Sequence, residues 1–175
     1  MSNHRTDQYG GSVENRIRFP LRVIQAVAGA IGADRTAFRV SPYSTFQGMK
    51  MAKPLDTFVP YVTEAVKLPL AYVHAVEGRI SGASDSTDGQ SDDESLAPLR
   101  DVVKAAGHNT RFLVAGGYTA QSVLKHAEQF PDDLVAFGRL FIANPDLVDR
   151  IAHGWSVNKY DRSTFYGGDS KGYTE

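Results

Sequence analysis

Two short apolar segments end in glycine, and both have the residue types of an anion-binding turn. Residues 111–117 read Arg-Phe-Leu-Val-Ala-Gly-Gly, and residues 134–139 read Leu-Val-Ala-Phe-Gly-Arg. Glycine lets the backbone approach a ligand closely, and the free N–H groups at the start of a following helix favour negative charge. An arginine beside the second glycine adds a guanidinium suited to phosphate. The sequence therefore predicts a phosphate site formed by Gly116, Gly117, Gly138 and Arg139.

These two segments read as the last strands of a repeating strand–helix pattern. The hydrophobic spacing predicts strands at 36–41, 70–76, 112–115 and 134–137, and helices at 13–31, 57–66, 96–106, 120–130 and 145–151. Alternation of this kind predicts a parallel sheet with helices outside it. We interpret the fold class as α/β, with a leading helix and four βα units, which is half of an eight-stranded (β/α)₈ TIM barrel. A small doubly wound sheet is the alternative, because alternation alone does not separate the two.

The composition is that of one soluble globular domain spanning residues 1–175. The chain is 42% hydrophobic and 22% charged, whereas a complete barrel typically takes about 250 residues. A net charge of −1 argues against a nucleic-acid partner and against an anionic membrane surface. The absence of cysteine excludes disulfides and thiolate metal sites, and no apolar segment approaches 18 residues. We expect a cytoplasmic protein with no metal site.

Two segments have no periodic pattern. Residues 78–95 are rich in Gly, Ser and Asp and are predicted to form a mobile surface loop with solvent-exposed acids, and residues 155–175 an irregular tail. His74 lies within an apolar strand and is predicted to be a hydrogen-bonded core histidine. Arg5, Asp7 and Arg16 are predicted to make structural ion pairs before the first helix.

Four motifs together resemble one enzyme family. They are Arg-Thr-Asp-Gln-Tyr-Gly-Gly-Ser-Val-Glu-Asn-Arg at 5–16, Phe-Arg-Val-Ser-Pro-Tyr at 38–43, Phe-Gly-Arg-Leu-Phe-Ile-Ala-Asn-Pro-Asp at 137–146 and Asn-Lys-Tyr-Asp-Arg at 158–162. In order and spacing they resemble the Old Yellow Enzyme family, whose members are FMN-dependent NADPH dehydrogenases, or ene-reductases, on a (β/α)₈ barrel. The resemblance covers nearly the whole chain and corresponds to the family's C-terminal half.

The resemblance implies roles for seven residues in binding FMN. Arg39 is similar to the arginine at the flavin pyrimidine edge, where a cation stabilises anionic reduced flavin. Gly116, Gly117, Gly138 and Arg139 resemble the contacts at the phosphate end, although many relatives have asparagine at the position of Gly117. Phe165 and Tyr166 resemble the aromatic pair near the dimethylbenzene edge, and Gln47 a polar residue near the substrate. The implied reaction is the NADPH-dependent reduction of an activated, enone-type alkene.

The resemblance also implies what this chain does not supply. The family's substrate-anchoring His–Asn or His–His pair and its tyrosine proton donor precede the motif that starts at Arg5, so no catalytic residue is assigned here and activity of the chain alone is left open. A second copy or an N-terminal half-barrel is expected to complete the barrel. The rival hypothesis is a non-redox protein, either a truncated barrel acting as a cyclase or isomerase or a structural partner of another chain.

Overall fold

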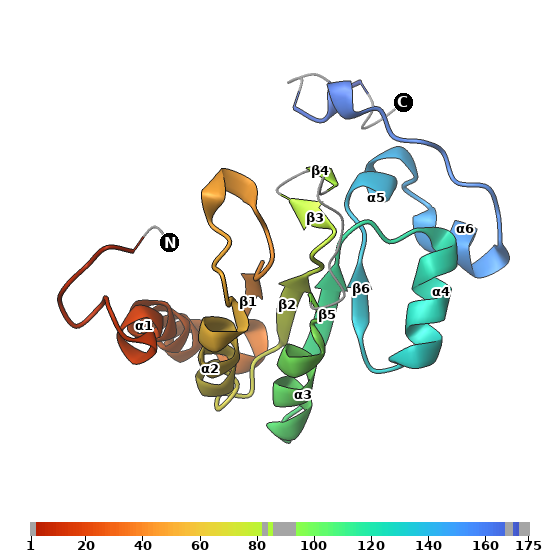
Figure 1. Ribbon diagram of the computed structural model, residues 1–175. Coiled ribbons are helices and arrows are strands. Elements are labelled where there is room, and N and C mark those ends of the chain that lie inside the picture. The colour runs from red at the N-terminus through yellow and green to blue at the C-terminus, as the bar shows by residue number, and fades with distance from the viewer. Residues whose placement is uncertain (1–2, 82–83, 86–93, 167–169, 172–175) are drawn as a thin grey trace.

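A four-stranded parallel sheet forms the centre of the computed structural model, which describes residues 3–81, 84–85, 94–166 and 170–171. The strands are β1 (Ala37–Val40), β2 (Tyr72–Val76), β5 (Arg111–Ala115) and β6 (Leu134–Ala136), and they lie side by side in that order (Figure 1). Each strand pairs in parallel with the next. The order never reverses, as it would at the switch point of a doubly wound sheet. The predicted parallel α/β fold is thus confirmed.

Helices connect the strands and pack against one another along the sheet. They are α1 (Val13–Ile31), α2 (Leu55–Ala65), α3 (Ala97–Ala105), α4 (Ala120–Gln129), α5 (Arg139–Ala143) and α6 (Leu147–His153). Helix α2 lies between α1 and α3, and α3 contacts β5. Side-chain caps start two of them: Ser12 accepts a hydrogen bond from the Asn15 N–H, and Thr119 accepts one from the Ser122 N–H. No helix in the described part of the chain is long and apolar enough to cross a bilayer.

The two faces of the sheet differ in the side chains they carry. Successive side chains in a strand point to opposite faces. In β2, Val73 and Ala75 are fully buried, whereas the alternate residues Tyr72 and His74 are more exposed. The buried face packs against the helices in a core that includes Val40, Val62, Val73, Leu99, Val103, Phe112 and Val114. The opposite face is therefore left for other contacts.

The structure corrects several predicted boundaries. The helix predicted at 145–151 is α6 at Leu147–His153, and α5, which starts at Arg139, was not predicted. The segment predicted as a mobile loop contains the two-stranded hairpin β3 (Ile80–Ser81) and β4 (Ser84–Asp85). Residues 82–83 and 86–93 of that segment lie outside the described residues. The three-residue 3₁₀ helices are η1 (Ala33–Arg35), η2 (Phe46–Gly48) and η3 (Arg162–Thr164).

One acidic residue of that segment is buried rather than exposed to solvent. Glu94 is 8% exposed, and its carboxylate is bonded to the ammonium of Lys50. The prediction of a solvated acidic loop is wrong at this position because a lysine more than forty residues earlier folds back to meet it. Burial of an unpaired carboxylate would be costly, and this pairing removes most of that cost.

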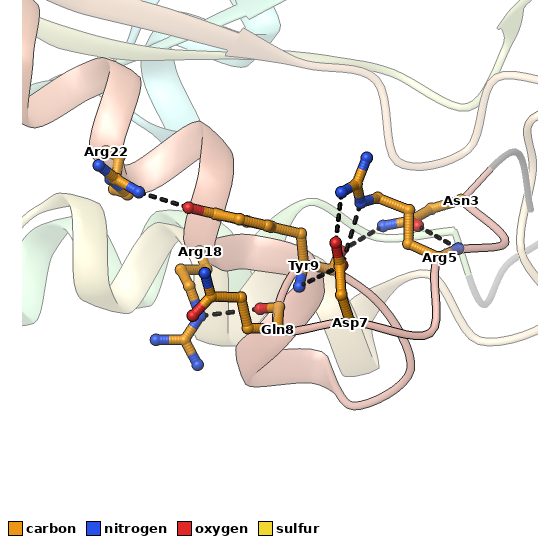
Figure 2. Close-up of polar contacts among 7 residues, drawn as sticks. All are labelled: Asn3, Arg5, Asp7, Gln8, Tyr9, Arg18 and Arg22. Atoms are coloured by element: carbon orange, nitrogen blue, oxygen red, sulfur yellow. Dashed lines mark hydrogen bonds and ion pairs between the residues drawn. The ribbon is translucent and has the colours of Figure 1, made fainter.

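Polar contacts hold the N-terminal loop, residues 3–11, beside α1 (Figure 2). The predicted ion pair between Arg5 and Asp7 is present, and Arg22 donates to the Tyr9 hydroxyl. Arg16, by contrast, has no ion-pair partner within the part of the chain that the structure describes. It donates instead to the Gly11 carbonyl at 2.6 Å and to the Thr57 hydroxyl at 2.8 Å, and so joins the loop to α2.

The segment predicted to be an irregular tail is tied to the body of the protein by one buried amide. Asn144 is fully buried, donates to the carbonyls of Leu140 and Asn158 at 2.8 and 3.0 Å, and accepts from the Asn158 N–H at 2.7 Å. Between them, Trp155 stacks on His153 with ring centroids 4.7 Å apart. The described residues after α6 thus have a defined path, although η3 is their only helix or strand.

Gly10 and Gly29 differ in whether the surrounding atoms leave room for a side chain. A Cβ at Gly10 would lie 1.9 Å from the Arg5 carbonyl oxygen, so Gly10→Ala forces the backbone of the N-terminal loop to move. A Cβ at Gly29, within α1, meets no atom within 4 Å. We expect Gly10→Ala to lower the free energy of unfolding by about 1–3 kcal/mol. We expect Gly29→Ala to raise it by about 0.5–1 kcal/mol, since alanine favours helix.

Urea denaturation of both variants would measure these changes. A Gly10→Ala protein as stable as the parent would show that the loop does not need the close approach of residues 5 and 10.

Candidate functional site

A cleft of about 680 Å³ opens at the carboxyl ends of the parallel strands. This volume lies within the range of about 300–1,000 Å³ common for ligand pockets. The face of the sheet opposite the helices contributes Arg39, His74, Val76, Ala115 and Ala136 to the lining. The structure also brings together in this lining all seven residues predicted to contact the cofactor: Arg39, Gly116, Gly117, Gly138, Arg139, Phe165 and Tyr166.

The turn after β5 has a backbone that needs glycine. Gly116 has φ +135° and Gly117 has φ +62°, two consecutive values that L side chains rarely adopt. A Cβ at Gly116 would also lie 2.9 Å from the Cβ of Glu77. The turn leads directly into the Thr119 cap of α4, as the sequence predicted. Its backbone is thus compact enough to leave the cleft open in front of it.

The backbone of the turn after β6 does not itself require glycine. Gly138 precedes α5 with φ −107°, a value open to other residues, but it lines the cleft and a Cβ there would meet no atom within 4 Å. The missing side chain leaves free volume for a ligand. The next residue, Arg139, is the first residue of α5, and its guanidinium lies 5.4 Å from the centre of the Tyr160 ring.

His74 faces the cleft instead of forming the predicted hydrogen-bonded core residue. It pairs in register with Arg39 of β1, and its Nε2 atom is buried without a hydrogen-bond partner among the described residues. Burial, and to a smaller extent the neighbouring Arg39 guanidinium, lowers the pKa of His74 from 6.5 to about 4. The imidazole is therefore neutral at pH 7. Because side chains alternate along a strand and His74 pairs with Arg39, the two side chains lie on the same face of the sheet.

The charge of the lining suits an anionic ligand. Arg39 and Arg139 contribute two guanidiniums, and the described lining residues include no aspartate or glutamate. The unpartnered His74 Nε2 offers a hydrogen bond, and the space at Gly138 can admit a bulky group. These features fit FMN, which has a phosphate dianion and a polar ring edge.

The aromatic residues lie at different depths of the cleft. Phe165 is buried and Tyr166 is 84% exposed, and their rings meet edge to face with centroids 6.4 Å apart. Tyr160, which was not predicted as a site residue from the sequence, also lines the cleft, and the centre of its ring lies 5.5 Å from that of Phe165. Gln47, expected near a substrate, lies in η2 with φ +54° and is absent from the described lining.

Residues 1–158 match the protein family described as the NADH:flavin oxidoreductase / NADH oxidase family. The chain is 44% identical, over 99% of its length and 46% of the relative's, to chanoclavine-I aldehyde reductase of Penicillium roqueforti. It is 39% identical, over 99% of its length and 45% of the relative's, to 12-oxophytodienoate reductase 7 of Oryza sativa subsp. japonica. The chain thus spans about half the length of the curated relatives that it matches.

Solved structures give the same result. Morphinone reductase superimposes with a TM-score of 0.83 at 36% identity, and the old yellow enzyme homologue from Zymomonas mobilis with 0.84 at 34%. Each match covers 99% of this chain, but only 44% and 47% of those proteins. The four βα units therefore correspond to part of a TIM barrel, in agreement with the predicted fold class.

The lowered pKa of His74 has a measurable effect on stability. Between pH 6.5 and about 4 the unfolded chain binds a proton at His74 that the folded chain does not, so stability falls as the pH falls through this range. We expect His74→Gln to remove this contribution, and the melting temperature of the parent to drop more between pH 7 and pH 5 than that of the variant.

The exposed His108 supplies a matched control, because His108→Gln makes the same chemical change outside the cleft. Identical pH dependence of the parent and the His74→Gln variant in thermal unfolding would contradict burial of a neutral imidazole in the cleft.

Proposed function

Because the chain belongs to the NADH:flavin oxidoreductase / NADH oxidase family, the Old Yellow Enzyme family, we propose that it carries the FMN phosphate site of a flavin-dependent oxidoreductase. The observation that supports this most directly is the cationic cleft with two glycine turns at the ends of β5 and β6. Neighbouring strand ends of this kind hold phosphate groups in many TIM barrels. Membership of this family confirms the resemblance seen in the sequence.

Each lining residue has a role in this proposal. Gly116, Gly117 and Gly138 expose backbone to the phosphate end, where Arg139 adds a positive charge. Arg39 lies on the first strand beside the neutral His74, and so presents a guanidinium toward the ring portion of the ligand. Phe165 offers an apolar surface to that ring, and Tyr166 lies at the solvent side.

The proposed reaction is a hydride transfer between a nicotinamide and a small substrate. When bound, FMN supplies the hydride carrier, with NADPH as the reductant and an activated, enone-type alkene as the acceptor. A fixed guanidinium at Arg39 stabilises negative charge on a reduced ring system. None of the comparisons supports the alternative of a non-redox cyclase, isomerase or structural protein.

A second polypeptide is part of the proposal because the described half-barrel exposes apolar surface. Phe19, Val23, Val27 and Ile31 recur every four residues along α1 and are 40–63% exposed. In the described sheet, β1 and β6 are the end strands and have one partner each. We propose that a second copy, or an N-terminal half-barrel, covers these surfaces.

Association can be measured without any ligand. We expect sedimentation velocity of the purified chain to show concentration-dependent association, and Val23→Lys to reduce it because the charge falls within the exposed stripe. Leu124→Lys, at an exposed position of α4, is the matched control. A chain that remains monomeric at all concentrations, like its Val23→Lys variant, would argue against coverage by a second copy and in favour of a different half-barrel.

Flavin binding is the direct test of the proposed function. We expect the purified protein to be yellow or to quench the fluorescence of added FMN, and NADPH to bleach the flavin absorbance. Arg139→Ala should raise the dissociation constant for FMN at least about tenfold, or about 1.4 kcal/mol, because it removes a phosphate contact. Gly138→Ala should weaken binding by filling the cleft, while leaving the melting temperature unchanged.

Arg111→Ala is the control, since it removes the same charge from the opposite end of β5. A colourless protein that does not bind added FMN would refute the proposal. Equal affinities for the Arg139→Ala and Arg111→Ala variants would remove Arg139 from the phosphate site.

A further inference from the structure

A continuous series of buried polar side chains runs from the outer helices to the back of the Gly116–Gly117 turn. Asp133, in the loop before β6, accepts from Arg100 Nε of α3 at 2.8 Å and lies 3.0 Å from His126 Nε2 of α4. His126 Nδ1 lies 3.1 Å from the Tyr118 hydroxyl, which donates to a Glu77 carboxylate oxygen at 2.8 Å. We call these five residues the polar chain.

Three members of the polar chain are almost completely removed from water. The side chain of Asp133 is 1% exposed, that of Arg100 7% and that of His126 9%. Arg100 also lies 3.8 Å from the centre of the Phe130 ring, so aromatic packing holds its guanidinium in place. Hydrogen bonds that involve charged groups are short and strong in such surroundings, and the series is therefore stiff.

At its other end the polar chain lies beside the Gly116–Gly117 turn, where Glu77 and the neighbouring Arg79 bond to the backbone. Arg79, two residues after Glu77, donates from Nε to the Gly116 carbonyl oxygen. Its guanidinium lies 4.5 Å from the centre of the Tyr118 ring. The Glu77 N–H donates to the Ala115 carbonyl at 2.9 Å, immediately before the turn. Tyr118 thus bonds through its hydroxyl to Glu77, the last member of the polar chain, and contacts through its ring Arg79, which is not a member.

The hydrogen bond from Arg79 fixes the direction of a second group. The Gly116 carbonyl and the Gly117 N–H belong to one planar peptide unit and point in opposite directions. A guanidinium bound to that carbonyl therefore turns the Gly117 N–H away from Arg79. Two successive glycines have more backbone freedom than other residues, so this bond helps to select one orientation of the peptide unit between them.

The Tyr118 hydroxyl sets the direction of one hydrogen bond in the polar chain. Burial and the neighbouring Glu77 carboxylate raise the pKa of Tyr118, so the phenol keeps its proton and donates it to Glu77.

We propose that Tyr118 and His126 are positioning residues, which hold Arg79 against the Gly116 carbonyl and thereby orient the Gly117 N–H for an anionic ligand. This inference rests on the proposed function for the identity of the ligand. Neither residue is assigned a contact with the reacting atoms. Tyr118 also lines the cleft, but its hydroxyl bonds to Glu77, so the hydroxyl acts on the ligand through Arg79 and the glycine turn.

The first test needs no ligand. We expect Tyr118→Phe and His126→Gln to shift or broaden the backbone amide signals of Gly116 and Gly117 in ¹H–¹⁵N NMR spectra. Tyr43→Phe is the matched control, because its buried hydroxyl donates to the Ser95 carbonyl at 2.7 Å, outside the polar chain. If all three variants leave the two glycine signals in place, or Tyr43→Phe moves them equally, the proposal is wrong.

The second test measures ligand affinity, with FMN and inorganic phosphate as the probes. We expect Tyr118→Phe to raise the dissociation constants about tenfold and Tyr43→Phe to leave them unchanged. Because Arg79 is only half-buried, the Arg79→Met substitution changes the contact with the glycine turn without altering the core. If the residues act as one unit, the double variant Tyr118→Phe/Arg79→Met loses about tenfold, like either single variant. Independent effects would multiply to about a hundredfold and would overturn the proposal.

The two tests separate this inference from the proposed function. A parent protein that binds neither FMN nor phosphate would refute the proposed function, and the glycine signals alone would then decide whether Tyr118 and His126 orient the turn. Should Tyr118→Phe fail to fold, the glycine signals of Arg79→Met decide in its place. Unchanged signals in that variant would overturn the proposal.

Discussion

The alternation of side chains along the strands is the constraint on which the remaining structure depends. In β2 and β5, Val73, Ala75, Phe112 and Val114 are buried against the helices, whereas His74, Val76 and Ala115, which alternate with them, line the cleft. A shift of one residue in register would exchange the two sets, placing Arg39 and His74 in the apolar core and Val73 in the cleft. The parallel pairing of the four strands therefore fixes the core and the cleft together.

The fold and the two glycine turns at the cleft could be predicted because they depend on local patterns. Apolar runs of four or five residues, helical spacing and the Thr119 cap each specify an element without reference to distant residues. Glycine at 116 and 117 could be interpreted in the same way, since a left-handed turn after a strand has a local cause. The family resemblance then brought in Arg39 and Phe165, which no local pattern connects to the two turns.

The predictions made from the sequence were wrong where a contact joins residues far apart in the chain. Lys50 pairs with the buried carboxylate of Glu94, and Arg79 donates to the carbonyl of Gly116, 37 residues later in the chain. Glu94 and Arg79 lie in a segment whose composition is typical of a loop. His74 was misjudged for a related reason: apolar neighbours in sequence suggested a core position, but in a strand the immediate neighbours point to the other face.

The stacking of Trp155 on His153 gives the protein a built-in optical reporter. Trp155 is the only tryptophan in the sequence, and it lies where the chain leaves α6 and turns back toward Tyr160 and Phe165 at the cleft. Indole emission depends on the ring against which it rests. In protein without bound flavin, the intrinsic fluorescence therefore reports whether this returning segment stays in place, with no added dye.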